Sequence, residues 1–111
     1  MLFIESRAFT ARLEQLAESA AAEVLLRIEE DLLANPVRGN TVQGLGGIRK
    51  ARVSNPARGK GKRGGFRYFF LYLERRQHIH LLFLLDKDEE EDLSTEERRV
   101  LRSLVEGIKR Q

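Results

Sequence analysis

The 111-residue chain contains no cysteine, so it can form no disulfide bond and offers no thiolate for catalysis or metal binding. It also lacks any run approaching the ~20 apolar residues that a membrane-spanning helix needs. The apolar start, Leu2–Ile4, ends at Glu5 and is too short for a secretory signal. We therefore expect a cytoplasmic protein that folds as a single domain over residues 1–111.

Acidic residues are missing from a long central stretch. Residues 32–73 contain no Asp or Glu, yet they hold nine basic residues, while the formal net charge of the whole chain is only +3. The nine are Arg38, Arg49, Lys50, Arg52, Arg58, Lys60, Lys62, Arg63 and Arg67. A surface that serves only solubility normally mixes both signs. This segregation therefore favours a face that binds a polyanion over a solvated basic loop.

The same stretch is rich in glycine but lacks the phosphate loop of nucleoside triphosphatases. Eight of the nine glycines lie between Gly39 and Gly65. None of them begins the required pattern of Gly, four residues, Gly-Lys and then Ser or Thr. We therefore expect no cofactor. Lysines and arginines separated by glycines can instead approach a nucleic-acid backbone closely, with affinity from charge and counterion release.

Hydrophobic periodicity predicts the secondary structure. A short strand at 2–4 is followed by two helices, which begin after the capping residue Ser6 and end before Pro36. Residues 48–53 can form a short strand. Residues 66–73 and 79–85 predict two strands joined by a hairpin, and their nearly continuous apolar character places both centrally in a sheet. Ser94 and Glu97 form a capping box at the start of a last helix.

The predicted order is β-α-α-β-β-β-α, which is an α+β domain. We expect a small antiparallel sheet with two N-terminal helices on one side and a C-terminal helix elsewhere. Alternation along the strand at 66–73 places Arg67 on one face with Phe69, and Tyr68 on the other. An arginine among these aromatic residues either pairs with an acid, such as Glu74, or meets the anion of a ligand.

Two histidines, His78 and His80, lie two residues apart and thus on one face of a strand. They could accept protons or bind a metal ion with a third ligand from Asp86 or Asp88. Histidines in strands more often satisfy local hydrogen bonds, so we expect no metal site. Tyr68 and Tyr72 could stack on a nucleobase, although a place in the core is the simpler interpretation.

Four segments taken together resemble a known family. They are 44–52 (GLGGIRKAR), 59–67 (GKGKRGGFR) leading into the aromatic strand, 85–89 (LDKDE) and 92–96 (DLSTE). In their order and spacing they resemble the RelE/HigB family of type II toxins within the RelE/ParE superfamily, and most of all its HigB-like branch. The resemblance covers most of the chain.

The resemblance implies a RelE-like microbial RNase fold and an mRNA endoribonuclease, or mRNA interferase, that acts on the ribosome and inhibits translation. In that chemistry the 2′-hydroxyl group attacks the neighbouring phosphate without a metal ion. Lys50 and Arg52 match paired cations on the family's second strand, with Lys50 as a candidate proton acceptor and Arg52 stabilising charge. Arg67 would bind the scissile phosphate, and Lys87 matches a cation after the last strand.

The remaining cations would contact the RNA backbone. These RNA-binding candidates are Arg49, Arg58, Lys60, Lys62 and Arg63. The chain departs from many relatives after Lys87, where Asp88 and further acids follow and no aromatic residue occurs beyond Phe83. The general base therefore stays open, with His80 or a loop residue as alternatives to Lys50.

The resemblance also implies partners. They are a helix-turn-helix antitoxin of the HigA-like type, the ribosome and its mRNA, and the free toxin is expected to be a monomer. Two other functions remain possible for the same basic surface. One is a non-enzymatic regulator that binds nucleic acid or the ribosome, and the other is a gyrase-targeting toxin of the same superfamily.

Overall fold

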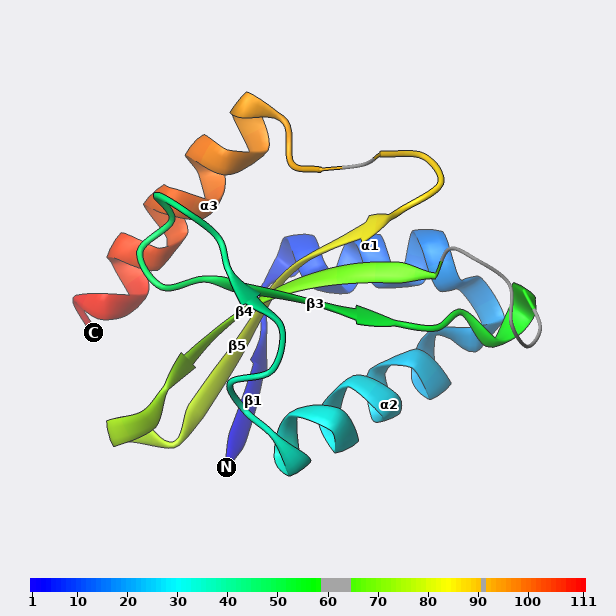
Figure 1. Ribbon diagram of the computed structural model, residues 1–111, viewed down its shortest axis with the longest axis horizontal. Coiled ribbons are helices and arrows are strands. Elements are labelled where there is room, and N and C mark those ends of the chain that lie inside the picture. The colour runs from blue at the N-terminus through cyan, green and yellow to red at the C-terminus, as the bar shows by residue number, and fades with distance from the viewer. Residues whose placement is uncertain (59–64, 91) are drawn as a thin grey trace.

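The computed structural model describes residues 1–58, 65–90 and 92–111. These segments form three α-helices and five strands (Figure 1). They are β1 (Leu2–Glu5), α1 (Arg7–Ala17), α2 (Ala21–Ala34), β2 (Asn40–Thr41), β3 (Arg49–Val53), β4 (Phe66–Leu73), β5 (His78–Asp86) and α3 (Thr95–Lys109). Short 3₁₀ turns occupy Glu18–Ala20, Pro56–Arg58 and Glu74–Arg76. In these segments, no helix is long and apolar enough to cross a membrane.

The five strands form one mixed sheet in the order β1-β5-β4-β3-β2. β4 and β5 lie inside the sheet, which confirms the expectation drawn from their apolar sequences. The expectation of an antiparallel sheet was wrong in one respect, because β1 pairs with β5 in parallel. The predicted order also omitted β2, whose two residues pair with the start of β3 inside the glycine-rich stretch.

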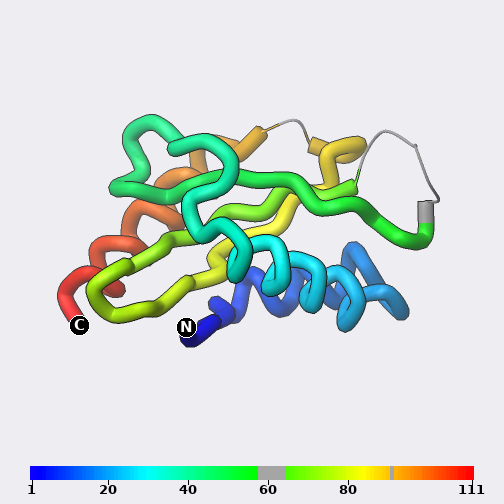
Figure 2. Tube along the Cα trace, turned by 60° about the horizontal axis from the view of Figure 1, so that its bottom comes forward, coloured from blue at the N-terminus to red at the C-terminus, as the bar shows by residue number. Residues whose placement is uncertain are grey.

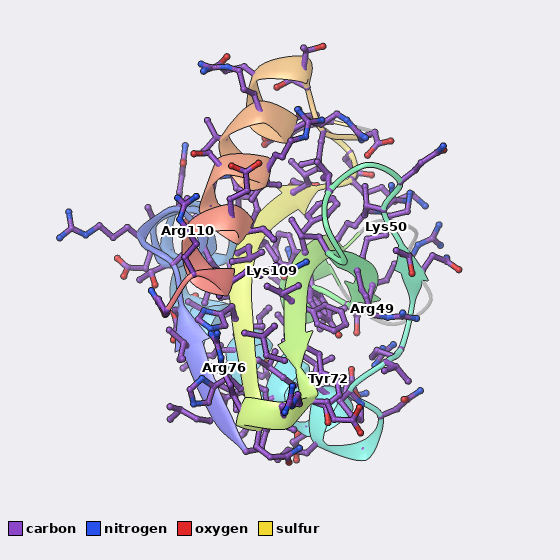
Figure 3. All side chains as sticks on the ribbon, turned by 90° about the vertical axis from the view of Figure 1, so that its left-hand side faces the viewer. Arg49, Lys50, Tyr72, Arg76, Lys109 and Arg110 are labelled. Atoms are coloured by element: carbon purple, nitrogen blue, oxygen red, sulfur yellow. The ribbon has the colours of Figure 1, made fainter. Side chains whose placement is uncertain are left out.

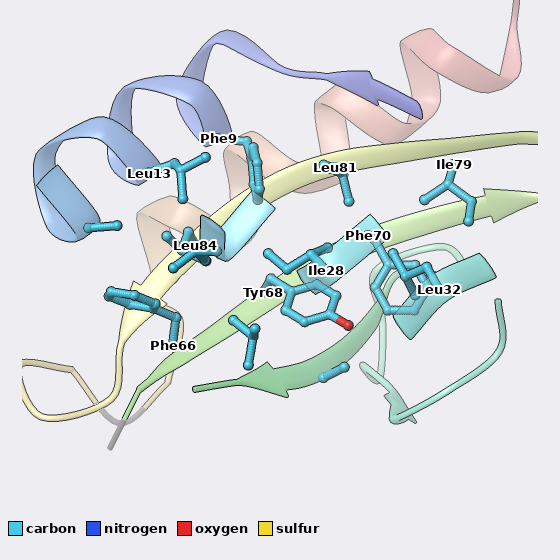
Figure 4. Packing of buried hydrophobic residues seen from close by; sticks show 14 residues of the cluster. Phe9, Leu13, Ile28, Leu32, Phe66, Tyr68, Phe70, Ile79, Leu81 and Leu84 are labelled. Carbon is cyan, nitrogen blue, oxygen red and sulfur yellow. The ribbon is translucent and has the colours of Figure 1, made fainter. Parts of the chain in front are cut away.

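The sheet has a helical layer on each face. α1 and α2 cover one face, and α3 crosses the other (Figures 1 and 2). Tyr68 and Phe70 of β4 pack under α1 and α2, together with Phe9 and Ile28 (Figure 4). Phe69 of the same strand packs on the opposite side with a second set of buried residues that includes Leu101, Val105 and Ile108 of α3. The predicted alternation along β4 is therefore confirmed.

Local capping fixes where two of the helices begin. The Ser6 hydroxyl accepts a hydrogen bond from the Phe9 N–H at 3.0 Å and donates one to the Leu82 carbonyl of β5 at 2.7 Å. At α3, Ser94 and Glu97 exchange the two hydrogen bonds of a capping box, as predicted. Such caps satisfy N–H groups that the first helical turn leaves unpaired.

α3 also holds the loop between β2 and β3. Arg98 donates to the Gln43 carbonyl at 2.7 Å, and Arg102 donates to the Gly44 carbonyl at 3.3 Å. Lys109, labelled in Figure 3, donates to the Gly46 carbonyl at 2.6 Å. These three contacts tie the start of β3, and therefore its cations, to the helix on that face of the sheet.

Candidate nucleic-acid cleft

The pairing of β3 with β4 brings basic side chains to one face of the sheet. Arg52 lies directly opposite Arg67, and Lys50 lies opposite Phe69. Opposed residues of two neighbouring strands point to the same face, and alternate residues along a strand share a face. Lys50, Arg52 and Arg67 therefore project from the face that α3 covers further along the sheet.

These three cations line one cleft of about 290 Å³. It lies beside the part of β3 that β2 leaves unpaired. The lining residues are Arg38, Gly39, Asn40, Lys50, Ala51, Arg52 and Arg67. Among the described residues the lining thus includes four cations and no acid. Such a concentration of one sign attracts an anion and raises its local concentration. The structure thus brings Lys50, Arg52 and Arg67 together in one pocket, and their catalytic roles stay predictions.

The cleft opens beside the start of β2, where the pairing with β3 stops. The Val42 N–H donates to the Ile48 carbonyl at 2.8 Å, and the last strand pair in this direction is Asn40 with Lys50. Because backbone groups alternate along an antiparallel strand, the N–H and C=O of Arg52 point toward the same edge. No strand in the described part of the chain pairs with β3 there, so this edge offers a backbone donor beside the Arg52 side chain.

Arg38 enters the cleft from outside the sheet and was not among the site residues expected from the sequence. It follows α2, and its Nη1 lies 2.8 Å from Oδ2 of Asp31 on that helix. Its position within the acid-free stretch was the one available signal. What the sequence does not show is that the chain reverses after Pro36 and brings residue 38 beside β3.

The Arg49 side chain, unlike that of its neighbour Lys50, is hydrogen-bonded to the segment 38–41. Its guanidinium group donates to the carbonyls of Arg38 and Gly39, both at 3.1 Å, and to the Thr41 hydroxyl at 3.3 Å. It alternates with Lys50 along β3 and is not among the residues that line the cleft. Arg49 thus fastens the segment 38–41 to β3, and its contact with RNA stays a prediction.

The side chains of the other expected RNA-binding residues fall outside the described structure. The backbone of Arg58 belongs to a 3₁₀ turn, but its side chain is outside the described structure, as are Lys60, Lys62 and Arg63. Lys87 follows β5, is half-buried, and donates its backbone N–H to the Gly65 carbonyl at 3.4 Å. Lys87 does not line the cleft, so its catalytic role also stays a prediction.

His80 lies buried in β5, between Ile4 of β1 and Leu71 of β4 in the strand register. Burial lowers the pKa of His80, and the nearby His78 and Arg76 lower it further. The rings of His78 and His80 are 6.1 Å apart. Neither histidine lines the cleft, and the described residues contain no cluster of three or more His, Cys, Asp or Glu suited to a metal ion.

Tyr68 belongs to the core, in line with the simpler interpretation of its sequence position. The residue is fully buried under α2 (Figure 4). Burial raises the pKa of its hydroxyl group to about 12, an effect that Arg38 opposes and Asp31 reinforces. The hydroxyl is therefore protonated at neutral pH and cannot act there as a proton acceptor.

Comparison with known proteins identifies the fold. No family model matches the sequence. The isolated E. coli RelE toxin superposes with a TM-score of 0.54 at 12% sequence identity, over 98% of this chain and 96% of RelE. A double arginine-to-alanine mutant of E. coli RelE in the free state gives a TM-score of 0.56 at 12% identity, over 81% of this chain and 86% of that one.

A chain of a toxin-antitoxin complex is similar as well. The intact E. coli RelBE toxin-antitoxin complex matches with a TM-score of 0.53 at 12% identity, over 75% of this chain and 92% of that one. At this level of identity the comparisons establish the architecture. The chain has a RelE-like α+β fold, with a mixed five-stranded sheet and a C-terminal helix.

Proposed function

We propose that this chain is the toxin of a type II toxin-antitoxin pair and cleaves mRNA on the ribosome, thereby stopping translation. One observation carries the proposal. On a RelE-like fold, Lys50, Arg52 and Arg67 meet in a cleft whose described lining is basic and without acids. The HigB-like pattern of the sequence motifs supports a place in that branch of the family as part of this proposal.

The proposed reaction is an internal transesterification. The 2′-oxygen of one nucleotide forms a bond to the adjacent phosphorus, the bond from phosphorus to the 5′-oxygen breaks, and the products end in a 2′,3′-cyclic phosphate and a 5′-hydroxyl group. One proton leaves the attacking oxygen and one reaches the departing oxygen. Negative charge grows on the phosphate oxygens, where fixed cations are most effective. Arg67 and Arg52 supply those cations, and a guanidinium group can bind two phosphate oxygens at once.

Lys50 is the proposed proton acceptor. It is half-buried on β3 beside Arg52, and among the three cations of the sheet it is the one whose side chain can exist as a neutral base. His80 and Tyr68 do not line the cleft and are therefore less suited to this role. The amine can accept a proton only in its neutral form, and a variant that keeps the positive charge but cannot lose its proton tests this assignment.

The proposal also names partners. The ribosome positions the mRNA, and Arg49 together with the cations of the segment 58–63 contacts the RNA backbone. Lys87 is kept as the fourth catalytic cation. A helix-turn-helix antitoxin of the HigA-like type restrains the toxin, which is a monomer when free. Action on translating ribosomes places the protein in the cytoplasm.

Expression in growing bacteria tests the function. We expect the wild-type chain to arrest growth and to create new transcript ends within translated reading frames, and Arg67→Ala to do neither. Arg99→Ala is the matched control, because Arg99 is exposed on α3 and pairs with Glu96 of the same helix at the surface. Growth arrest with intact transcripts supports a non-enzymatic regulator, and double-strand DNA breaks support a gyrase-targeting toxin. Either result overturns the proposal.

A further inference from the structure

The cleft is larger than a single phosphate group requires. Its volume of about 290 Å³ is close to the lower end of pockets that hold whole small ligands. Its polar residues fall into two groups. Lys50, Arg52 and Arg67 rise from β3 and β4, whereas Arg38 and Asn40 come from the end of the segment that follows α2, where it joins the sheet as β2. The proposed cleavage chemistry uses only the first group.

Arg38 is oriented but not saturated by its partner Asp31. The ion pair joins one terminal nitrogen of Arg38 to one carboxylate oxygen at 2.8 Å, and the Arg38 side chain remains 32% exposed. A guanidinium group has five N–H donors in a fixed plane. A carboxylate that holds one edge of this plane leaves the other edge able to bind two phosphate oxygens. Asp31 thus acts as a positioning residue for Arg38.

The backbone that carries Arg38 is held firmly in place. Arg49 donates to the carbonyls of both Arg38 and Gly39, as described above. Gly39 has a φ of +77°, and a Cβ atom at this position would come within 1.9 Å of the Lys50 carbonyl oxygen. Only glycine lets the segment lie this close to β3. These contacts fix the Arg38 backbone beside β3, at the wall of the cleft that the sheet cations also line.

A plain surface ion pair is the simpler account of Arg38 and Asp31. Exposed pairs of this kind contribute little to stability. Asp31 already has Arg27 on the next turn of the same helix, 3.8 Å away, so its charge does not depend on Arg38 alone. Two observations favour a ligand-binding role. Arg49 and Gly39 hold the backbone of residues 38 and 39 beside β3, and Arg38 lines the cleft.

We propose that Arg38 forms a second phosphate-binding subsite, assisted by Asn40 and by the open backbone edge at Arg52. This inference rests on the proposed function and deepens it. The cleft takes a segment of single-stranded RNA with two neighbouring phosphates, one bound at Arg67 for cleavage and one at Arg38. The Asn40 side chain lies on the face of its strand partner Lys50 and can donate to the same phosphate or to a base edge.

Equilibrium binding tests the subsite without any cleavage step. The probes are 2′-O-methylated dinucleotides with one internucleotide phosphate, and the same molecules with an added phosphate at either the 5′ or the 3′ end. Binding to the purified protein is followed by NMR titration at low salt. In one of the two arms, the added phosphate is expected to tighten binding to the wild-type chain by about tenfold, as hydrogen bonds to a charged group do.

The variants separate the two phosphate sites. Arg38→Gln should lose this gain and bind the one-phosphate probe within about twofold of wild type, since the Arg67 site is intact. Arg67→Gln should weaken every probe, and Arg99→Gln none. Asp31→Asn should reduce the gain in part, with thermal melting as the check on folding for each variant. If Arg38→Gln retains the gain in both arms, or the wild-type chain shows none, the subsite does not exist.

This outcome is distinct from failure of the proposed function. A protein that leaves mRNA intact on ribosomes can still show the Arg38-dependent gain. Conversely, an active ribonuclease whose second phosphate adds nothing at Arg38 refutes the subsite alone.

Discussion

Arg52 and Arg67 stand directly opposite each other on β3 and β4, so the sheet places two like charges at one cross-strand position. Like charges in this arrangement destabilise a sheet. An anion bound between the two arginines offsets that repulsion. The unfavourable pairing is therefore consistent with a cleft that binds a phosphate group.

The first prediction follows from this opposition. Arg52→Gln should leave the free energy of unfolding unchanged or raise it by up to about 1 kcal/mol, because one repulsive contact disappears. The same variant should slow mRNA cleavage by about a hundredfold, since a fixed charge is lost at the reacting phosphate. Urea unfolding and a cleavage time course measure the two effects. A loss of more than about 1 kcal/mol would show that Arg52 supports the fold rather than opposing it.

Lys50→Arg separates charge from proton transfer. Arginine keeps the positive charge but cannot be deprotonated in a protein. We expect the variant to bind 2′-O-methylated RNA within about threefold of wild type and to lose cleavage by roughly a hundredfold or more. Cleavage at the wild-type rate assigns Lys50 to charge stabilisation and moves the proton acceptor elsewhere.

Gly39→Ala tests the close approach of the 38–41 segment to β3. A positive φ and a contact of 1.9 Å with the Lys50 carbonyl oxygen both oppose a Cβ atom there. We expect a loss of about 3 kcal/mol in unfolding free energy. Gly44→Ala is the control, because Gly44 has a similar φ of +78° but no atom within 4 Å of the added Cβ. It should cost only about 1 kcal/mol. Equal losses for the two variants would mean that the contact at Gly39 is easily relieved.

The buried His80 predicts an acid-sensitive fold. Its pKa lies below the ordinary value of 6.5, chiefly through burial. The unfolded chain therefore binds the proton first as the pH falls through 6.5, and stability is lost from there down to the folded-state pKa. His80→Leu should lose less stability than wild type between pH 7.5 and pH 5, because these values lie about one unit or more on either side of the ordinary histidine pKa of 6.5. Urea titrations at both pH values measure this. Equal losses in wild type and His80→Leu would show that His80 does not contribute.

Local features of the fold could be predicted from the sequence because they depend on neighbouring residues. Ser6 and Ser94 cap helices as their positions indicate. The alternation of β4 sends Tyr68 to one core and Phe69 to the other. By contrast, the parallel pairing of β1 with β5 joins segments more than 70 residues apart, and no local pattern specifies it. β2 was missed because two polar residues, Asn40 and Thr41, carry no strand periodicity.

The candidate site shows the same division. Lys50, Arg52 and Arg67 were named together through the family resemblance, and the pairing of β3 with β4 is what brings their side chains to one face. Arg38 could not be predicted as part of the cleft, because its position depends on tertiary contacts with Asp31 and Arg49. The sequence marks Arg38 only as one cation among nine in an acid-free stretch.

Cleavage of a defined mRNA on translating ribosomes by the purified chain tests the central claim most directly. The account predicts fragments with a 2′,3′-cyclic phosphate and a 5′-hydroxyl end. It also predicts that neither Arg67→Ala with normal mRNA nor the wild-type chain with mRNA carrying a single 2′-deoxynucleotide at the cleavage position gives product. Intact mRNA with the wild-type chain, or continued cleavage next to the 2′-deoxynucleotide, contradicts it.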